Sequence, residues 1–339
     1  MLVCPNCGGT SCVVAVEAII AQAPFLYTKC ERCADLALDK QSKIDLSEIS
    51  FEDYACSGCG KRPLDAVMGH ILSLVVDDKK KPDMSLREVG TPLLAPNVPL
   101  YASPHLSNRS LVLLTNKRTI AHASDQIVQD VPEIKAILYG DPARVIGLAH
   151  TQIGAYTCQV RSGCDLRADL VTSAYGQLLI YKSQSKIHIE HDNREKIHKL
   201  GSIPLQGAVV FDALSGPGTL GLTSVLMGAK KVILNDAWHP AVNDAYLNMC
   251  VNRRVLGLRS IKRIRDEDRS SYGEPTLFSV ARGDSAEIEL YDGTFEQFSD
   301  QELNVDVILV DPFPRTEFRF QRTISKIKQK NPTARIYFI

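Results

Sequence analysis

A glycine-rich turn between a buried strand and a helix constrains this sequence more than any other feature. The segment "GAVVFDAL" (207–214) has the length and apolar content of a buried strand. It is followed by "SGPGTLGLTSVLMGA" (215–229), which carries Gly216, Gly218 and Gly221 in the spacing G-x-G-x-x-G. "KKVILNDA" (230–237) then predicts a second strand. A strand, a glycine turn, a helix and a strand in this order predict a βαβ unit of a parallel sheet.

The same alternation continues to the end of the chain. The later segments are a helix "HPAVNDAYLNMCVNR" (239–253), strands "TLFSVARGDSAEI" (276–288) and "VDVILVDPF" (305–313), a helix "TEFRFQRTISKIKQK" (316–330) and a last strand "ARIYFI" (334–339). Residues 201–339 are therefore expected to form a Rossmann-like α/β domain with a mostly parallel sheet.

Two further regions precede this domain. Residues 1–80 hold most of the cysteines and end in a helical pattern at 64–76, and a charged stretch at 77–85 marks a boundary. Residues 86–200 mix short strands and helices, so an α+β domain is expected there. In it, "QLLIYKSQSKIHIEH" (177–191) alternates like a half-buried strand.

The histidines of the middle region are not predicted to bind metal. They lie on patterns typical of solvated strand and helix positions, and they are His188, His191 and His198.

Three cysteine pairs in the first sixty residues predict a zinc-binding, ribbon-like domain. Two residues separate the cysteines of each pair, a spacing that lets both thiolates of a tight turn bind one ion, and 22 residues separate successive pairs. The pairs are Cys4 and Cys7, Cys30 and Cys33, and Cys56 and Cys59. The pattern leaves open which four share an ion, and a second ion would need Cys12 or His70. Chance pairs or a redox dithiol are the alternative.

Composition adds little about partners. The 39 basic and 39 acidic side chains give a net charge of zero, so composition alone does not favour a nucleic-acid binder. No apolar run approaches the ~20 residues of a membrane span, and the start "MLVCPNC" does not resemble a signal peptide. A cytoplasmic protein without membrane contact is expected.

Asp212 separates two cofactor classes that the glycine loop could bind. Asp236 lies twenty residues after Gly216 and completes a dinucleotide fingerprint, so an NAD-linked oxidoreductase is one interpretation. Asp212 ends the first strand, where its carboxylate would repel phosphates at the helix N-terminus. S-adenosylmethionine has no phosphate and carries two cations. The sequence therefore favours S-adenosylmethionine, with Asp236 on the ribose and Asp284, at the end of the third predicted strand, on the adenine amine.

The "DPFP" turn after the fourth strand predicts the substrate side of the same crevice. Proline ends the strand, which leaves the Asp311 carboxylate and the Pro312 carbonyl as two hydrogen-bond acceptors. Two acceptors on an exocyclic base amine would localise its lone pair toward a methyl donor, and Phe313 would stack on the base. A simple strand-ending turn is the alternative.

Three motifs carry a family resemblance. "VVFDALSGPGTLGL", "VILNDAWHPAV" and "DVILVDPFP" resemble those of class I methyltransferases, and are closest to the tRNA guanine exocyclic-amine (dimethylguanosine) family, whose first motif also reads D-A-L-S. The stretch from 131 to 201 resembles, more loosely, the domain that precedes the fold in tRNA guanine ring-nitrogen methyltransferases. The resemblance implies cofactor contacts from Asp212, Ala213, Ser215, Gly216, Gly218 and Asp236, and base contacts from Asp311, Pro312 and Phe313.

Two features depart from that family. Pro314 and Arg315 replace the glycine and serine that usually follow D-P-F, so the substrate pocket is expected to differ. The sequence has no antiparallel strand pair after the fifth strand, so either the sheet is truncated at that edge or it is covered by another segment, a partner chain or self-association.

A basic stripe supports RNA as the partner despite the neutral net charge. Four cations fall on one face of the helix after the D-P-F turn, at Arg319, Arg322, Lys326 and Lys330. An ordinary solvated helix face is the alternative. The sequence thus predicts a zinc-containing, S-adenosylmethionine-dependent methyltransferase of RNA, acting on a guanine in tRNA. The alternatives are a methyltransferase of a protein amide or small molecule, and a non-catalytic zinc-ribbon nucleic-acid-binding protein with an inactive methyltransferase fold.

Overall fold

The computed structural model describes residues 2–147, 155–190, 193–264, 274–313 and 316–339. The chain forms two compact units, one of Met1–Val145 with Thr157–Asp169, and one of Ile146–Tyr156 with Leu170–Ile339. These borders differ from the three predicted domains, because the first 145 residues form one unit and residues 170–200 belong to the unit that contains the C-terminal sheet. No helix in the described ranges is long and apolar enough to cross a membrane.

The first unit contains short helices and a four-stranded mixed sheet in the order β2-β4-β5-β6. Only the β4–β5 pair is parallel. Its elements are α1 (Val16–Gln22), η1 (Glu52–Tyr54), β1 (Arg62–Pro63), α2 (Leu64–Val75), η2 (Leu86–Val89), β2 (Thr91–Leu94), β3 (His105–Leu106), β4 (Leu111–Thr115), α3 (Arg118–His122), α4 (Ser124–Asp130), β5 (Ile134–Tyr139) and β6 (Gln159–Gly163). The helix predicted at 64–76 is α2.

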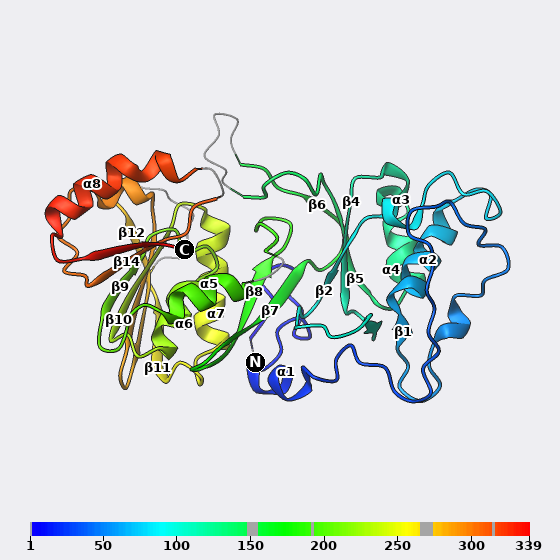
Figure 1. Ribbon diagram of the computed structural model, residues 1–339, viewed down its shortest axis with the longest axis horizontal. Coiled ribbons are helices and arrows are strands. Elements are labelled where there is room, and N and C mark those ends of the chain that lie inside the picture. The colour runs from blue at the N-terminus through cyan, green and yellow to red at the C-terminus, as the bar shows by residue number, and fades with distance from the viewer. Residues whose placement is uncertain (1, 148–154, 191–192, 265–273, 314–315) are drawn as a thin grey trace. The chain divides into compact units, whose positions relative to one another are not determined.

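The second unit is built on a seven-stranded sheet in the order β11-β12-β13-β10-β9-β14-β15 (Figure 1). Its elements are β7 (Leu166–Ser173, which begins in the first unit), β8 (Gly176–Ser183), α5 (Arg194–Gly201), β9 (Val209–Asp212), α6 (Thr219–Leu226), β10 (Lys231–Asp236), α7 (His239–Val251), β11 (Leu258–Arg263), β12 (Thr276–Gly283), β13 (Glu287–Asp292), η3 (Phe295–Phe298), β14 (Val307–Val310), η4 (Glu317–Phe320), α8 (Gln321–Lys330) and β15 (Arg335–Phe338).

The five strands from β13 to β15 are parallel, and their order is that of a Rossmann-like sheet. The predicted α/β fold class is therefore confirmed. In the described part of the chain, β15 is an edge strand with no partner on its outer side.

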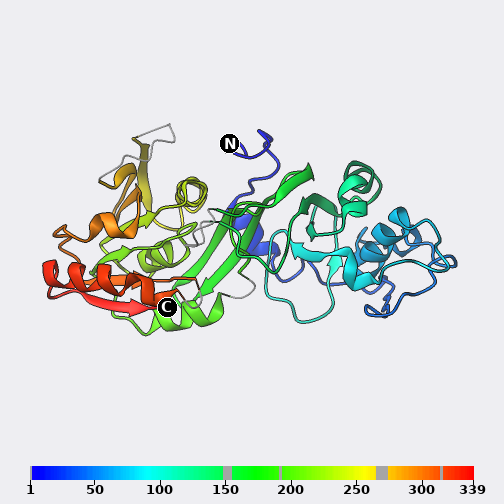
Figure 2. The ribbon, with the colours of Figure 1, turned by 90° about the horizontal axis from the view of Figure 1, so that it is seen from above.

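Both faces of the sheet are buried, which explains the nearly continuous apolar strands. Val210 and Leu309 point into a core shared with α5, α6 and α7, whereas Phe211 and Ile308 point into a second core with η3 and α8. In Figures 1 and 2, α8 accordingly lies on the opposite side of the sheet from α6 and α7.

The third strand of the parallel sheet was predicted at the wrong place. Residues 276–283 form β12, which runs antiparallel to β13, and β13 is the true third parallel strand. A second antiparallel strand, β11, which the sequence pattern did not reveal, completes that edge. The glycine and aspartate before Ser285 form a hairpin turn here. The segment that was predicted as a single strand is therefore a strand followed by a turn.

The strand predicted at 177–191 is also too long. β8 ends at Ser183, because the backbone amides of Lys186 and Ile187 both donate to the Ser183 carbonyl and the side-chain amide of Gln184 donates to the Ile187 carbonyl. The chain therefore turns at 184–186, and the alternation at 187–190 does not belong to a strand.

Three polar side chains, two on α7 and one on the residue that directly follows it, hydrogen-bond to the backbone of β8 as a neighbouring strand would. They are spaced four residues apart, which places them in one row along the helix, and they are Asp244, Asn248 and Asn252, all buried. Asn252 and Asn248 each accept from one β8 amide and donate to the same residue's carbonyl, at Leu179 and Tyr181, over 2.7–3.0 Å. The Asp244 carboxylate accepts from the Ser183 amide. This ladder fixes β8 on α7 and satisfies a buried strand edge.

Candidate active site

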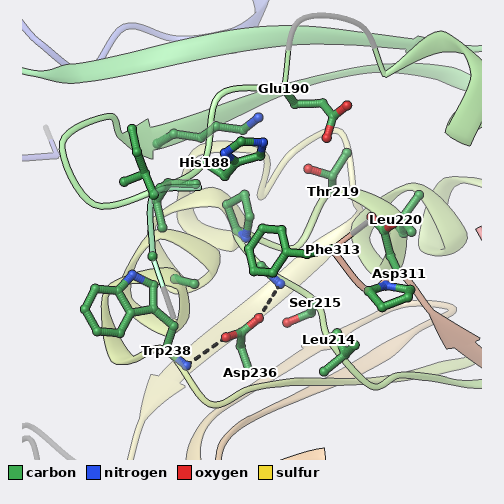
Figure 3. Close-up of a pocket in the computed structure, with 18 of the residues that line it drawn as sticks. His188, Glu190, Leu214, Ser215, Thr219, Leu220, Asp236, Trp238, Asp311 and Phe313 are labelled. Carbon is green, nitrogen blue, oxygen red and sulfur yellow. Dashed lines mark hydrogen bonds between the residues drawn. The ribbon is translucent and has the colours of Figure 1, made fainter. Parts of the chain in front are cut away.

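A cavity of about 400 Å³ lies at the carboxyl ends of β9, β10 and β14. Its volume is in the range of small-molecule sites, and ligands of such sheets bind at this end of the strands. One wall is the glycine loop with Ser215 and Gly216, and another is the segment after β14 with Asp311, Pro312 and Phe313. The third wall comes from β8, the segment after it and α5. The structure thus brings the two predicted halves of the site together (Figure 3).

Each glycine of the loop is needed for a different structural reason. Gly216 and Gly218 have φ values of +52° and +88°, which side chains disfavour, and a Cβ at Gly216 would meet nothing within 4 Å. A Cβ at Gly221 would lie 2.1 Å from Leu234 Cδ2, so only glycine lets α6 pack this closely on β10. The loop therefore offers bare backbone to a ligand in the cavity.

Asp212 does not face the cavity, contrary to the prediction. Its side chain is fully buried, and its Oδ2 accepts a 2.8 Å hydrogen bond from the Gly221 amide in the first turn of α6. Burial, and then the charge of Asp311, raise the pKa of Asp212 to about 8. The carboxylate therefore caps the end of α6 from behind the loop. Ala213 is buried beside it and does not line the cavity.

Asp236 ends β10 and does line the cavity. Its two oxygens accept hydrogen bonds from the Gly216 amide at 2.7 Å and the Trp238 amide at 2.8 Å (Figure 3). Burial raises the pKa of Asp236 to about 6, although both amide hydrogen bonds lower it. These amides fix the carboxylate's orientation, while each oxygen keeps a second lone pair for a ligand hydroxyl.

Two buried polar atoms near the loop lack partners among the described residues. They are the second oxygen of Asp212, Oδ1, and the hydroxyl oxygen of Ser215, which lines the cavity. A buried polar atom without a hydrogen bond is costly unless a ligand or water satisfies it. The loop is therefore suited to a ligand with hydrogen-bond donors.

Asp311 is part of a charged cluster that sequence reasoning missed. Lys196 of α5 places its Nζ 2.8 Å from Asp311 Oδ2 and 3.0 Å from Glu190 Oε2, and all three side chains line the cavity. Burial raises the pKa of Asp311, and the charge of Lys196 opposes the rise. Glu190 and Lys196 belong to no recognisable motif, so only the folded chain reveals them.

Phe313 packs edge-on against His188, with 5.7 Å between the ring centroids (Figure 3). His188 was interpreted as a solvated strand residue, but the turn at 184–186 brings it to the cavity, where it is half-buried. His191, Pro314 and Arg315 lie outside the described residues.

Asp284 is not at the cavity, so its predicted adenine contact is wrong. It lies in the β12–β13 turn, at the amino end of β13 and hence at the opposite end of the sheet, where it is exposed and forms an ion pair with Arg259. Asp292 is the residue that ends the third parallel strand, and its Oδ2 lies 2.6 Å from His239 Nδ1.

Eight cysteines form two clusters of four, both within the first unit. Cys30, Cys33, Cys56 and Cys59 form one, and Cys4, Cys7, Cys12 and Cys164 form the other. Neighbouring sulfurs lie 3.4–3.7 Å apart, close to the ~3.8 Å of a tetrahedron with zinc–sulfur bonds of ~2.3 Å.

The sequence predicted the three cysteine pairs. In the structure two of the pairs form one cluster, and Cys12 and Cys164 complete the cluster of Cys4 and Cys7. Gly8 and Gly60 follow the knuckles with φ values of +71° and +72°, as tight turns require. Cys164 was missed because it lies 160 residues from Cys4. His70 contacts Arg62 and Glu52 instead of the thiols, so it is not an extra ligand.

No family model and no curated protein matches the sequence. Among solved structures, Trm5b from Pyrococcus abyssi is 11% identical with a TM-score of 0.40, over 70% of this chain and 56% of Trm5b. Trm1 from Pyrococcus horikoshii with S-adenosyl-L-methionine is 22% identical with a TM-score of 0.30, over 42% of this chain and 36% of Trm1. TYW2 from P. horikoshii with MeSAdo is 14% identical with a TM-score of 0.44, over 78% and 76% of the two chains.

This chain therefore spans less than two thirds of the first two structures. At these identities and scores the likeness does not bear on activity, and the function proposed below rests on the residues of the site.

Proposed function

We propose that the chain is an S-adenosylmethionine-dependent methyltransferase that modifies an exocyclic amine of a nucleobase in RNA, with a guanine in tRNA as the substrate that the sequence resemblance implies. The observation that carries the proposal is one cavity that joins the glycine loop and Asp236 to Asp311, Pro312 and Phe313. A cofactor held on the first wall would lie next to a base held on the second.

The loop favours S-adenosylmethionine over a dinucleotide. A dinucleotide places its phosphates on the free amides at the N-terminus of the helix after the loop. Here Asp212 already accepts from the Gly221 amide in that first turn, so this amide is not available to a phosphate. The Ser215 hydroxyl, which has no hydrogen-bond partner among the described residues and lines the cavity, can accept from the ammonium of S-adenosylmethionine. The residues present therefore fit S-adenosylmethionine.

Asp236 and the loop backbone would hold the cofactor, which supplies a methyl group on a sulfonium sulfur. Transfer of that methyl group to the base nitrogen would leave a neutral thioether and would require the amine to lose one proton. Asp311 accepts a hydrogen bond from that amine and can take the proton, while Phe313 provides a face for the extruded base.

The basic stripe on α8 would contact the RNA backbone. Arg322, Lys326 and Lys330 are exposed on α8, whereas Ile327 on its other face is fully buried, so the predicted amphipathic helix is confirmed. Cations in such a row suit phosphates. The proposal of RNA predicts that reversing these charges weakens substrate binding without changing cofactor binding.

Both cysteine clusters are proposed to hold zinc. Thiolates at this spacing fit a tetrahedral ion, and four sulfurs in each cluster leave no open ligand position, so the ions would be structural rather than catalytic.

Intrinsic fluorescence gives a direct test of the cofactor. Trp238 is the only tryptophan of the chain and lines the cavity, so S-adenosylmethionine or S-adenosylhomocysteine should change its emission, and NAD should not. Asp236→Ala should weaken this binding by ~1–3 kcal/mol, because a hydrogen bond to a charged group is lost. Tight binding of NAD instead would favour the oxidoreductase.

The α7 ladder predicts a second effect on the cofactor loop. Asn248 also donates to the Pro217 carbonyl of the loop at 2.9 Å, whereas Asn252 makes the matching bonds to β8 without touching the loop. Both alanine variants should lower stability. Only Asn248→Ala should also weaken S-adenosylhomocysteine binding, by ~0.5–1.5 kcal/mol, because the loop loses an anchor. Equal affinities in fluorescence titrations of the two variants would contradict this role.

The activity itself is tested by incubating the protein with labelled S-adenosylmethionine and unmodified tRNA, total RNA, protein or small-molecule extracts. Transfer to RNA, followed by mass spectrometry of nucleosides, is the expected result. Transfer to protein or small molecules alone would keep the chemistry and reject RNA. No transfer to any of them would favour a non-catalytic protein.

A further inference from the structure

The charged cluster of Lys196, Asp311 and Glu190 has a role beyond binding a base. Lys196 comes from α5, outside the parallel sheet, yet its ammonium lies between two carboxylates of the cavity at 2.8 and 3.0 Å. Its side chain is 28% exposed and that of Asp311 is 19% exposed, so water screens this pair only in part.

A carboxylate accepts most strongly from an amine, and can take its proton, only while it is ionised, since the protonated form donates on one oxygen and accepts as a neutral group on the other. Burial works against the ionised form of Asp311 and raises its pKa, and Glu190 raises it further. Lys196 is the main opposing group, and Lys199 of the same helix adds to it. From β9, the buried Asp212 interacts electrostatically with Asp311.

We propose that Lys196 is a positioning residue that keeps Asp311 ionised and holds its Oδ2, so that Oδ1 is presented to the amine of the base. The inference rests on the proposed methyl transfer and assigns this site a residue that no sequence motif contains. Lys196 itself makes no contact with the methyl group, because its ammonium is engaged by the two carboxylates.

The first test measures the protonation of Asp311 directly and does not require catalytic activity. Protein labelled with ¹³C at aspartate carboxyl carbons is titrated by NMR, and Asp311→Asn assigns the signal. In Lys196→Met, Asp311 should titrate at least about one pH unit higher than in the wild type, a tenfold change in proton affinity. Lys196→Arg should restore the wild-type titration, because it keeps the charge.

Glu190→Gln is the matched control, since it removes the other partner of Lys196 from the same cavity. It should move the titration of Asp311 in the opposite direction, to lower pH, because a negative neighbour is lost. An unchanged titration in Lys196→Met, or equal shifts of the same sign in both variants, would overturn the inference.

The second test uses the pH profile of kcat/KM with RNA. Because the ionised form of Asp311 is the active one, a higher pKa moves the acid limb of the profile to higher pH. Lys196→Met should therefore lose at least tenfold at low pH and recover as the pH rises, with unchanged thermal stability and S-adenosylhomocysteine binding. A loss of equal size at every pH would show a merely structural role. Wild-type protein without transfer at any pH, but with the NMR shift intact, would reject the proposed function and leave the electrostatic role standing.

Discussion

Replacing Asp311 with alanine is expected to lower methyl transfer to RNA by ~10²-fold or more. The reason is that a hydrogen bond of ~3 kcal/mol to the reacting amine is lost in the transition state. Cofactor affinity, measured by Trp238 fluorescence, should change by less than about tenfold, since Asp311 belongs to the segment after β14 and not to the glycine loop. The measurement is single-turnover transfer of labelled methyl to tRNA at saturating cofactor.

Asp311→Asn separates the two roles of this carboxylate. An amide oxygen still accepts a hydrogen bond, so the asparagine variant should be more active than alanine if the acceptor matters. If asparagine were as inactive as alanine, Asp311 would act as the proton acceptor, which suits a ring nitrogen as the target. Full activity of both variants would show that the turn after β14 is only structural.

Phe313→Ala complements these variants. It should weaken RNA binding by ~1–3 kcal/mol through lost stacking.

Metal analysis of the purified, reduced protein is expected to give two zinc ions per chain, one for each cluster of four thiols. Cys164→Ser should reduce the content to one under a competing chelator, because three thiolates hold zinc less tightly than four. Removing both ions should unfold much of the first eighty residues, because binding free energy of structural zinc is folding free energy.

Cys158→Ser is the matched control for the zinc experiment. Cys158 is buried, lies six residues before Cys164 and belongs to neither cluster, so its replacement should leave two ions bound. Protein without zinc under reducing conditions would refute the metal sites. One ion in the wild type, lost both in Cys33→Ser and in Cys164→Ser, would mean that the clusters share a single site.

The parallel sheet and its cofactor loop could be predicted because their signals are local. Gly216, Gly218 and Gly221 follow a strand within ten residues, and both faces of the strands are buried, which leaves an unbroken apolar pattern. The sequence signal of the D-P-F turn was equally local. The position of Asp212 behind the loop could not be predicted, because the sequence places it at a strand end but does not say to which side its carboxylate turns.

The errors have different causes. The strand predicted at 276–288 runs through the polar turn at Gly283, Asp284 and Ser285, a local signal that was overlooked, whereas the turn after Ser183 is stabilised by hydrogen bonds of Lys186 and Ile187 that no periodicity encodes. Lys196, Glu190 and Cys164 reach their partners through tertiary contacts, over up to 160 residues of chain. Such partners follow from the fold and not from spacing.

The two cysteine clusters also impose an order on how the chain can mature during synthesis. The cluster of Cys30, Cys33, Cys56 and Cys59 has all its thiols once the first sixty residues exist, whereas the other waits for Cys164, about 100 residues later. At the ~5–20 residues per second of translation, that delay lasts roughly 5–20 s. During this interval Cys4, Cys7 and Cys12 form an incomplete, reactive set of thiols, so the N-terminal segment depends on a reducing environment or on a provisional fourth ligand until the middle of the chain has been made.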